Sequence, residues 1–322
     1  RTAAKIAPDY SMSPPSPDAA QTPEIPVGRP SLSAAWWLAL RPKTLSVSVA
    51  PVLVGSALAY SESGTFLLWP ALVAVLSAML IQVGTNLHND VSDFERGADT
   101  PDRLGPPRAT AMGWLPATAV RRAAWSAFLL AFVFGIALVA RGGLAIVVIG
   151  LASLVSGWAY TNGPRPIAYT PLGEVFVLVF FGLAAVGGSY YLQTLSFSPA
   201  AAVAAAMLGA FGAAVISVNN TRDLGTDARA GKNTLAVRAG RPAMNAVYFV
   251  EMLVPYALLP VLAGLLGKGW SLALPCLSAG MALQLCRRFV ATTPGAGFND
   301  LLSATARLQA AYALLLALGL VL

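Results

Sequence analysis

Two short polar segments interrupt an otherwise apolar sequence, and both carry aspartates at helical spacing. The first is NLHNDVSDFERGADTPDRLGPPR at 86–108, and the second is NNTRDLGTDARAGKNTL at 219–235. Residues three or four apart share one face of a helix. This spacing groups the side chains of Asn86, Asn89, Asp90 and Asp93 in the first segment, and those of Asp223 and Asp227 in the second. Carboxylates this close repel each other at a membrane boundary unless a cation lies between them.

The chemistry open to these side chains is that of a hard metal ion and a phosphorylated ligand. The chain contains a single histidine and two cysteines, so neither an imidazole nor a thiolate cluster can be built and any metal must be held by oxygen. Several oxygen ligands suit Mg²⁺, which completes its shell with water and substrate phosphates. Interspersed basic residues supply the partners that a diphosphate requires. They are Arg103, Arg108, Arg222 and Lys232.

The elements that position these residues are membrane helices. The 322 residues are 57% hydrophobic and only 11% charged, with a mean hydropathy of +0.67, whereas soluble domains carry about 25% charged residues. The net charge of +7 resides in short loops rather than on one polar face. This distribution is typical of membrane topology and argues against nucleic acid as a partner.

Apolar segments of about twenty residues predict an all-α polytopic membrane protein with nine transmembrane helices. The segments lie near 40–60, 66–88, 118–140, 143–161, 172–192, 199–219, 244–266, 270–290 and 301–321. Arginine and lysine are concentrated in the amino-terminal tail and in the loops after the even-numbered segments. The positive-inside rule therefore places the tail, these loops and both Asp-rich motifs on the cytoplasmic face. Residues 1–34, rich in Pro, Ser and Ala, are expected to form a disordered tail before a membrane domain at 35–322.

The acidic motifs resemble those of the UbiA superfamily of intramembrane aromatic prenyltransferases, whose members carry two Asp-rich motifs on a bundle of nine helices. The first motif of that superfamily reads N-x-x-x-D-x-x-x-D. Asn89 and Asp93 fit this pattern, Gly97 takes the next position in register, and the acidic residue follows at Asp99.

The motif spacing that results is similar to that of the 1,4-dihydroxy-2-naphthoate branch of the superfamily, which makes demethylmenaquinone. The branch resemblance extends to the spacing from Asn89 to Arg108, to NN-x-RD-xxx-D-xxx-GK-x-TLAVR from Asn219, and to YTNGPRPIAYTPLGEVFVLVFFG at 160–182. It covers roughly residues 35–322 and leaves out the tail.

The resemblance implies a reaction, a cofactor and a set of site residues. A prenyl group is transferred from a polyprenyl diphosphate to 1,4-dihydroxy-2-naphthoate, with loss of CO₂ and diphosphate, giving demethylmenaquinol. The cofactor is Mg²⁺, bound between the two motifs together with the diphosphate. The implied metal ligands are Asn89, Asp90, Asp93, Asp99, Asp223 and Asp227, and the catalytic residues among them are Asp93, Asp223 and Asp227. The residues expected to bind the diphosphate are Arg103, Arg108, Arg222 and Lys232.

Three further residues are candidates for binding the aromatic acceptor. Arg41 and Lys43, in RPKT at 41–44, are either an interfacial basic anchor or a site for the acceptor carboxylate. Tyr160 either packs against the substrate or is an ordinary interfacial aromatic residue.

Two other functions compete with this interpretation. One is prenyl transfer to another acceptor, such as 4-hydroxybenzoate or homogentisate. The other is transport of a metal ion or small anion, because intramembrane charges also mark ion pathways; clustering of the acidic motifs at one face and the lack of a visible internal repeat argue against it. We expect an integral protein of the bacterial plasma (inner) membrane whose active site faces the cytoplasm. The expected partners are the two substrates and the lipid bilayer, without nucleic acid or a protein partner.

Unpaired charge within an apolar segment is costly, so the charged residues of the spans are expected to face the bundle interior. They are Glu174, Glu251 and Arg307.

Overall fold

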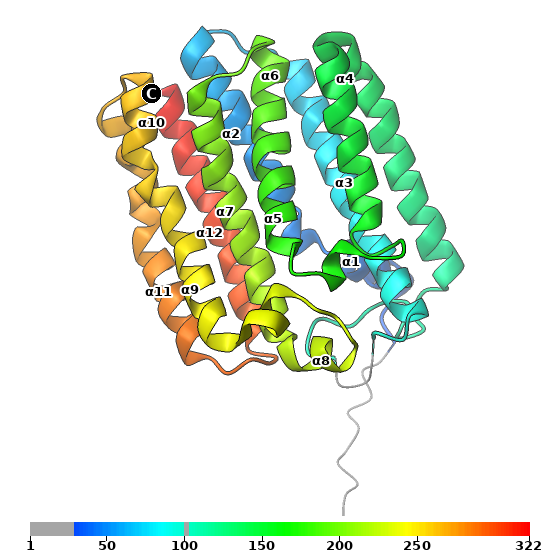
Figure 1. The fold of residues 1–322 in the computed structure, drawn as a ribbon. Helices are drawn as coiled ribbons and strands as arrows, with labels where there is room; N and C mark the ends of the chain where they lie inside the picture. The colour runs from blue at the N-terminus through cyan, green and yellow to red at the C-terminus, as the bar shows by residue number, and fades with distance from the viewer. Residues whose placement is uncertain (1–28, 100–102) are drawn as a thin grey trace, which may run out of the picture.

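The computed structural model describes residues 29–99 and 103–322, and this part of the chain is helical and contains no strand (Figure 1). Most of the predicted disordered tail, residues 1–28, lies outside the described residues. Helix α1 (Leu32–Leu40) begins inside the last part of that tail, because the Ser31 side chain caps it by accepting a hydrogen bond from the Ala34 amide.

Eleven further α-helices follow in the described chain. They are α2 (Ser46–Ser63), α3 (Leu68–Glu95), α4 (Ala117–Ala159), α5 (Gly173–Val177), α6 (Gly188–Thr194), α7 (Pro199–Arg222), α8 (Leu224–Arg229), α9 (Leu235–Ala257), α10 (Leu259–Leu266), α11 (Ala279–Ala291) and α12 (Phe298–Val321). The short 3₁₀ helices are η1 (Pro42–Thr44), η2 (Ile167–Tyr169) and η4 (Trp270–Ser278). A π-helical stretch, η3 (Leu178–Gly187), joins α5 and α6 into one rod.

Six helices of the described chain are long and apolar enough to cross a membrane, and a seventh results if Leu32–Thr44 and Ser46–Ser63 form one bent span. The predicted class, an all-helical integral membrane protein, is therefore confirmed. Helix α4 covers two predicted segments, because its 43 residues turn at Gly143, which has φ 58°. Glycine adopts this left-handed backbone readily, and the two legs of α4 lie side by side (Figure 1). The predicted segment 270–290 is also helical, as η4 followed by α11.

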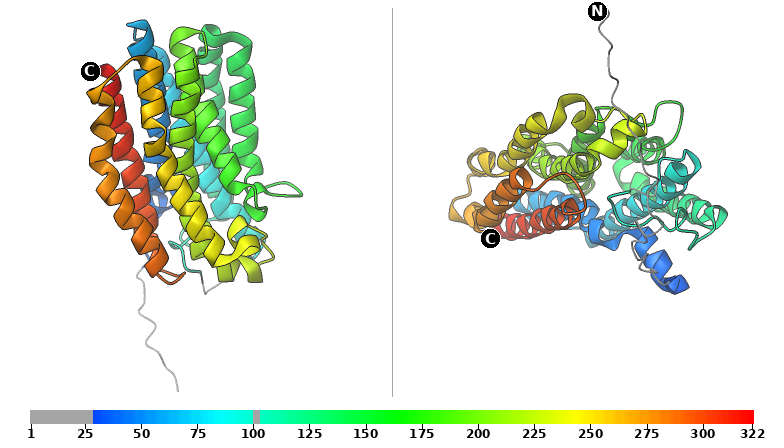
Figure 2. Two further views of the ribbon diagram at one scale, coloured as in Figure 1. Left: turned by 60° about the vertical axis from the view of Figure 1, so that its left-hand side comes forward. Right: turned by 90° about the horizontal axis from the view of Figure 1, so that it is seen from below.

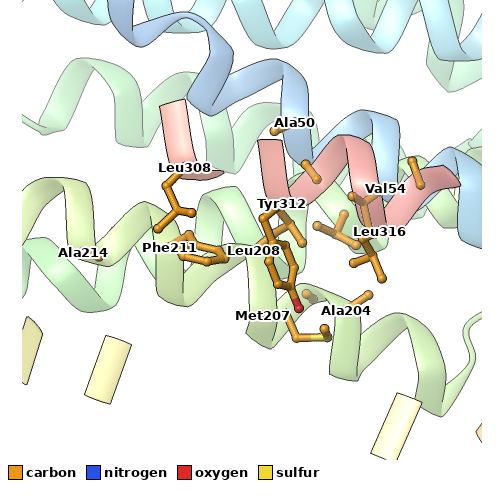
Figure 3. Packing of buried hydrophobic residues seen from close by; sticks show 14 of the residues in the cluster. Ala50, Val54, Ala204, Met207, Leu208, Phe211, Ala214, Leu308, Tyr312 and Leu316 are labelled. Carbon is orange, nitrogen blue, oxygen red and sulfur yellow. The ribbon is translucent and has the colours of Figure 1, made fainter. Parts of the chain in front are cut away.

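Helix α7 is at the centre of the bundle. In its most apolar stretch 78% of the residues are buried, against 17% in α4, whose outer surface is left for lipid. Phe211 of α7 packs edge-on against Tyr312 of α12 with ring centroids 4.9 Å apart, and Val54 of α2 lies in the same cluster (Figure 3). This packing brings α2, α7 and α12, which are distant in sequence, into one core.

Small residues let α7 approach the α5–α6 rod closely. A Cβ atom added to Gly209 would lie 2.7 Å from the carbonyl oxygen of Leu178, and one added to Gly182 would collide with the carbonyl oxygen of Ala205. Such backbone-to-backbone packing is common where lipid supplies no hydrophobic driving force between helices.

The two acidic motifs lie at the same end of the bundle. Helix α3 ends at Glu95 and α7 at Arg222, next to α8 (Figure 1). The carboxyl terminus lies at the opposite end. Seen from below, α1 projects at the edge of the bundle near α3 (Figure 2). Residues 96–99 and 103–116 and the connections through α8 and η2 are thus the elements available to enclose the acidic end.

Candidate active site

A cavity of about 1140 Å³ lies among α2, α3, α4, the α5–α6 rod, α7 and α12. Its long wall is apolar and includes Val52, Leu138, Ile146 and Phe180. Its other end is polar, and among the described residues six cationic and four acidic side chains line it. They are Arg41, Lys43, Arg103, Arg108, Arg222 and Lys232, with Asp93, Asp223, Asp227 and Asp300. The excess of cations suits an anionic group, and the apolar wall suits a hydrocarbon chain attached to it.

Asp93 is the centre of the first motif. Its carboxylate is paired with the buried guanidinium of Arg108, and its Oδ1 accepts a hydrogen bond from the Tyr169 hydroxyl at 3.4 Å. Asn89, one turn earlier on α3, lines the same cavity and accepts a hydrogen bond from the Thr161 hydroxyl at 2.7 Å. The structure therefore brings Asn89 and Asp93 together on the cavity face of α3.

Asp90 is not on that face, in contrast to the expectation that it binds metal. Its Oδ1 accepts from the amide of Thr110 at 2.9 Å and its Oδ2 from the amide of Ala109 at 3.0 Å. Adjacent positions on a helix point in different directions, so Asp90 holds the returning loop while its neighbour Asn89 reaches the cavity.

Asp99 differs from the expectation in a similar way. Its side chain is buried outside the cavity lining, and its Oδ1 pairs with Arg103 at 2.6 Å and with Arg108 at 3.3 Å. Both arginines line the cavity. In this arrangement Asp99 aims two cations at the cavity instead of presenting its own carboxylate there.

Arg222 organises the second motif. Its guanidinium donates to both carboxylate oxygens of Asp223, at 2.8 and 2.6 Å. It also donates to the side-chain oxygens of Asn299 at 2.8 Å and Asn219 at 2.9 Å. Arg222 was predicted to bind diphosphate, and it does line the cavity. Its donors are nevertheless directed to protein oxygens, so its geometry is that of a residue that orients Asp223.

The second carboxylate of this motif, Asp227, faces the first motif. Burial raises its pKa to about 6, an effect that the charge of Lys232 opposes and the charges of Asp223 and Asp93 reinforce. Lys232 Nζ lies 3.4 Å from Asp227 Oδ1 and 5.0 Å from the centre of the Tyr169 ring. Asp93 of the first motif and Lys232 of the second both act on the Asp227 carboxylate, and Lys232 also acts on Asp93, so charges of the two motifs influence each other across the cavity.

Two contacts that sequence reasoning missed complete the polar end. Tyr169 touches Asp93 and stacks under Lys232, so it contacts residues of both motifs. Asn299, at the start of α12, accepts from Arg222 and donates to the carbonyl of Leu104 at 2.9 Å. Tyr169 falls in the segment 160–182 that carried part of the family resemblance, which was a usable signal. Nothing in the sequence around Asn299 marks it as part of the site.

The three acceptor candidates line the same cavity. Arg41 ends α1 in the left-handed region, with φ 55°, a conformation that is uncommon for a residue with a side chain. Lys43 follows in η1, and Tyr160 directly follows the last residue of α4.

The charged residues of the spans divide into two groups. Glu174 is buried and accepts from Asn220 at 2.9 Å, and Glu251 accepts from the Ser217 hydroxyl at 3.0 Å. Arg307, in contrast, is exposed on α12, so the expectation that it faces the bundle interior is wrong. A long cationic side chain can extend along a helix toward the membrane surface, which makes this position tolerable.

The oxygen donors of the cavity fit a magnesium ion that is shared with a ligand. Within residues 29–99 and 103–322, no three acidic, histidine or cysteine side chains are close enough to hold a metal by themselves. Mg²⁺, however, usually takes only one or two carboxylates and completes its shell with water and phosphate oxygens. Asp93, Asp223 and Asp227 line the cavity together with Arg103 and Lys232, and this combination of carboxylates and cations fits that pattern.

Comparison with known proteins adds a family and a fold. Residues 48–299 match the model of the UbiA prenyltransferase family. A protein of Escherichia coli (strain K12) named 1,4-dihydroxy-2-naphthoate octaprenyltransferase is 40% identical over 216 residues, which cover 65% of this chain and 70% of that protein. A protein of Mycobacterium tuberculosis with the same name is 36% identical over 216 residues, 67% of this chain and 73% of that protein. A UbiA homolog from Archaeoglobus fulgidus, solved with DMAPP and Mg²⁺, superimposes with a TM-score of 0.60 at 13% identity, covering 88% of this chain and 99% of that one.

Proposed function

Because the chain belongs to the UbiA prenyltransferase family, we propose that it transfers a prenyl group from a polyprenyl diphosphate to 1,4-dihydroxy-2-naphthoate. The products are demethylmenaquinol, CO₂ and diphosphate. The observation that carries this proposal is the meeting of two acidic motifs, more than a hundred residues apart, at the cationic end of one apolar cavity. The names of the E. coli and M. tuberculosis relatives support the choice of acceptor.

The diphosphate binds at the polar end of the cavity. Asp93, Asp223 and Asp227, with the amide oxygen of Asn89, would hold Mg²⁺, which when bound supplies positive charge that stabilises the leaving diphosphate. Arg103 and Lys232 line the cavity beside these carboxylates and add their own positive charge for the phosphate oxygens. The prenyl chain extends from this end along the apolar wall.

The chemistry needs no added proton donor. The allylic C–O bond breaks and both of its electrons leave with the diphosphate. The electron-rich ring of the naphthoate forms the new C–C bond at the carbon that carries the carboxylate. The carboxylate then leaves as CO₂, and the electrons of its C–C bond restore the aromatic ring. The task of the protein is to hold the two reactants within about 3–3.5 Å in the right orientation, with Arg41 or Lys43 engaging the acceptor carboxylate before its loss.

We further propose that the bundle crosses the membrane nine times. This count takes each leg of α4 as one crossing, α1 to α2 as one bent crossing, and η4 with α11 as another. With basic loops at the acidic end, the positive-inside rule then places the site at the cytoplasmic face of a bacterial plasma membrane.

The test is to incubate purified protein with Mg²⁺, a long-chain prenyl diphosphate and each aromatic acid in turn, under anaerobic conditions. The naphthoate is labelled at its carboxyl carbon. We expect labelled CO₂ to appear in step with a prenylated naphthoquinol. Turnover of 4-hydroxybenzoate or homogentisate alone would refute the acceptor and retain prenyl transfer. Uptake of ions into vesicles without any prenylated product would instead favour transport.

A further inference from the structure

A buried polar pair lies beside the cavity, one helical turn deeper than the acidic end. Glu174 of α5 is 5% exposed, and its Oε1 accepts a hydrogen bond from Nδ2 of Asn220 on α7 at 2.9 Å. Asn220 lines the cavity, whereas Glu174 stands behind it. Neither residue is needed to hold the metal or the diphosphate, so the pair calls for a separate explanation.

The contact with Glu174 determines which way the Asn220 amide faces. A carboxylate oxygen accepts hydrogen bonds, so the NH₂ group of Asn220 is directed at Glu174 and its carbonyl oxygen is directed away from it. The hydrogen bond to Glu174 also polarises the amide and makes its oxygen a stronger acceptor. Asn220 therefore offers the cavity an oriented hydrogen-bond acceptor.

Tyr160 lies on the same part of the wall. A Cβ atom added to Gly173, the residue before Glu174, would lie 3.8 Å from Asn220 Nδ2 and 4.0 Å from the Tyr160 hydroxyl. The two side chains thus flank one glycine, and this glycine leaves room between them. The Tyr160 hydroxyl therefore lies on the same part of the wall as the Asn220 amide.

This wall is at the depth that the aromatic acceptor must occupy. Asn220 precedes Asp223 by three residues, which is about 4.5 Å along a helix. The allylic carbon is bonded directly to the diphosphate, and the attacking ring carbon must come within about 3–3.5 Å of it. In 1,4-dihydroxy-2-naphthoate the 1-hydroxyl is adjacent to the carboxylate and can bond to it internally. The 4-hydroxyl has no such internal partner and depends on the protein.

We propose that Asn220 binds the 4-hydroxyl of the aromatic acid through its amide oxygen, and that Glu174 is the positioning residue that holds the amide in this orientation. The inference rests on the proposed function and adds a determinant of acceptor specificity to it. A site built to pair with a hydroxyl discriminates strongly against an analogue that lacks it, because a buried polar group is then left unpaired.

The test compares two naphthoates under anaerobic conditions with saturating Mg²⁺ and prenyl diphosphate. One measurement is kcat/KM for 1,4-dihydroxy-2-naphthoate, and the other is the inhibition constant of 1-hydroxy-2-naphthoate, which lacks the 4-hydroxyl. We expect Asn220→Ala and Glu174→Gln each to lower kcat/KM by roughly 10- to 100-fold and to change the inhibition constant by less than about threefold. Because Glu174 acts through Asn220, the double variant should be no worse than Asn220→Ala alone.

Glu251→Gln is the matched control. Glu251 is another carboxylate of the spans, held by Ser217 of the same helix α7, but neither residue lines the cavity. Its substitution should leave both measurements unchanged. Thermal unfolding and the KM for prenyl diphosphate identify variants that fold and still bind the other substrate. Asn220→Ala and Glu174→Gln change different helices, so either one that folds suffices to test discrimination.

Equal losses toward both naphthoates, additive losses in the double variant, or a raised KM for prenyl diphosphate would overturn this inference. If the wild type turned over the dihydroxynaphthoate and the variants did so equally well, only this inference would be overturned. Absence of any wild-type turnover of that acid would overturn the proposed function as well.

Discussion

Asp90 and Asp227 should respond in opposite ways to the same substitution, Asp→Asn. Asp90 is 2% exposed and accepts two backbone N–H groups. Asparagine keeps one acceptor oxygen and turns an NH₂ group toward the second N–H. The loss of one hydrogen bond to a charged group costs about 1.5–3 kcal/mol of stability. At about 2–4 °C for each kcal/mol, the midpoint of thermal unfolding should fall by roughly 3–12 °C.

Asp227→Asn should leave the unfolding midpoint unchanged or raise it. Burial disfavours the ionised form of this carboxylate, as its raised pKa shows, and its ion pair with Lys232 is long. Its charge is needed only when Mg²⁺ and the diphosphate bind. Removing one charge that holds the metal should lower turnover by at least about 100-fold, which is a typical cost for losing electrostatic stabilisation of a leaving group.

The assay follows unfolding by tryptophan fluorescence in detergent. Turnover is measured by product formation at about 20 °C below the lower midpoint of the two variants, which is nearly twice the largest expected shift. We expect Asp90→Asn to be less stable and to keep turnover within about tenfold of the wild type. Asp227→Asn should be as stable as the wild type and nearly inactive. If Asp90→Asn kept its midpoint and lost activity as Asp227→Asn does, Asp90 would be a metal ligand and the role assigned to it here would be refuted.

Three further outcomes are expected. EDTA should stop the reaction and Mg²⁺ should restore it. Because protons compete with the metal for Asp227 below its pKa of about 6, the Mg²⁺ concentration that gives half the maximal rate should rise by up to about tenfold per pH unit as the pH falls below 6. A Mg²⁺ requirement that does not change with pH would contradict this. Gly55→Ala should destabilise the bundle by about 1–3 kcal/mol, because the new Cβ would collide with the carbonyl oxygen of Val186, whereas Gly264→Ala meets no atom within 4 Å and should be neutral in thermal unfolding. Reporter fusions should place the amino terminus in the cytoplasm and the carboxyl terminus on the other side, since nine crossings is an odd number; both on one side would mean that the count is wrong.

The sequence predicted which residues line the cavity better than it predicted the contacts that each of them makes. Helical spacing correctly placed Asn89 and Asp93 on the cavity, because residues four apart must share a face. It also grouped Asp90 with them, which was wrong, because the partners of Asp90 are the backbone amides of Ala109 and Thr110. Whether a carboxylate meets a metal or a loop depends on the path of the chain after the helix, and no local pattern determines that path.

The same limit applies to contacts between distant helices. Apolar length predicted helices at each marked segment, since twenty apolar residues suffice to identify a span. The pairings of Glu174 with Asn220 and of Asn299 with Leu104 depend on which helices become neighbours. That arrangement is set by small residues such as Gly182 and Gly209, whose effect appears only when two backbones meet.

The bond from Asn299 to the carbonyl of Leu104 has a consequence for how the protein is made. These residues are 195 positions apart, so at about 5–20 residues per second a ribosome needs roughly 10–40 s to produce the second after the first. During that interval the loop around Leu104 lacks its anchor and Arg222 lacks one of its partners. Helix α2 also lacks its packing partner in the core until α12 has been synthesised. The half-made chain is thus a set of inserted helices without a finished site, and catalytic competence arrives late in synthesis, when α12 enters the membrane.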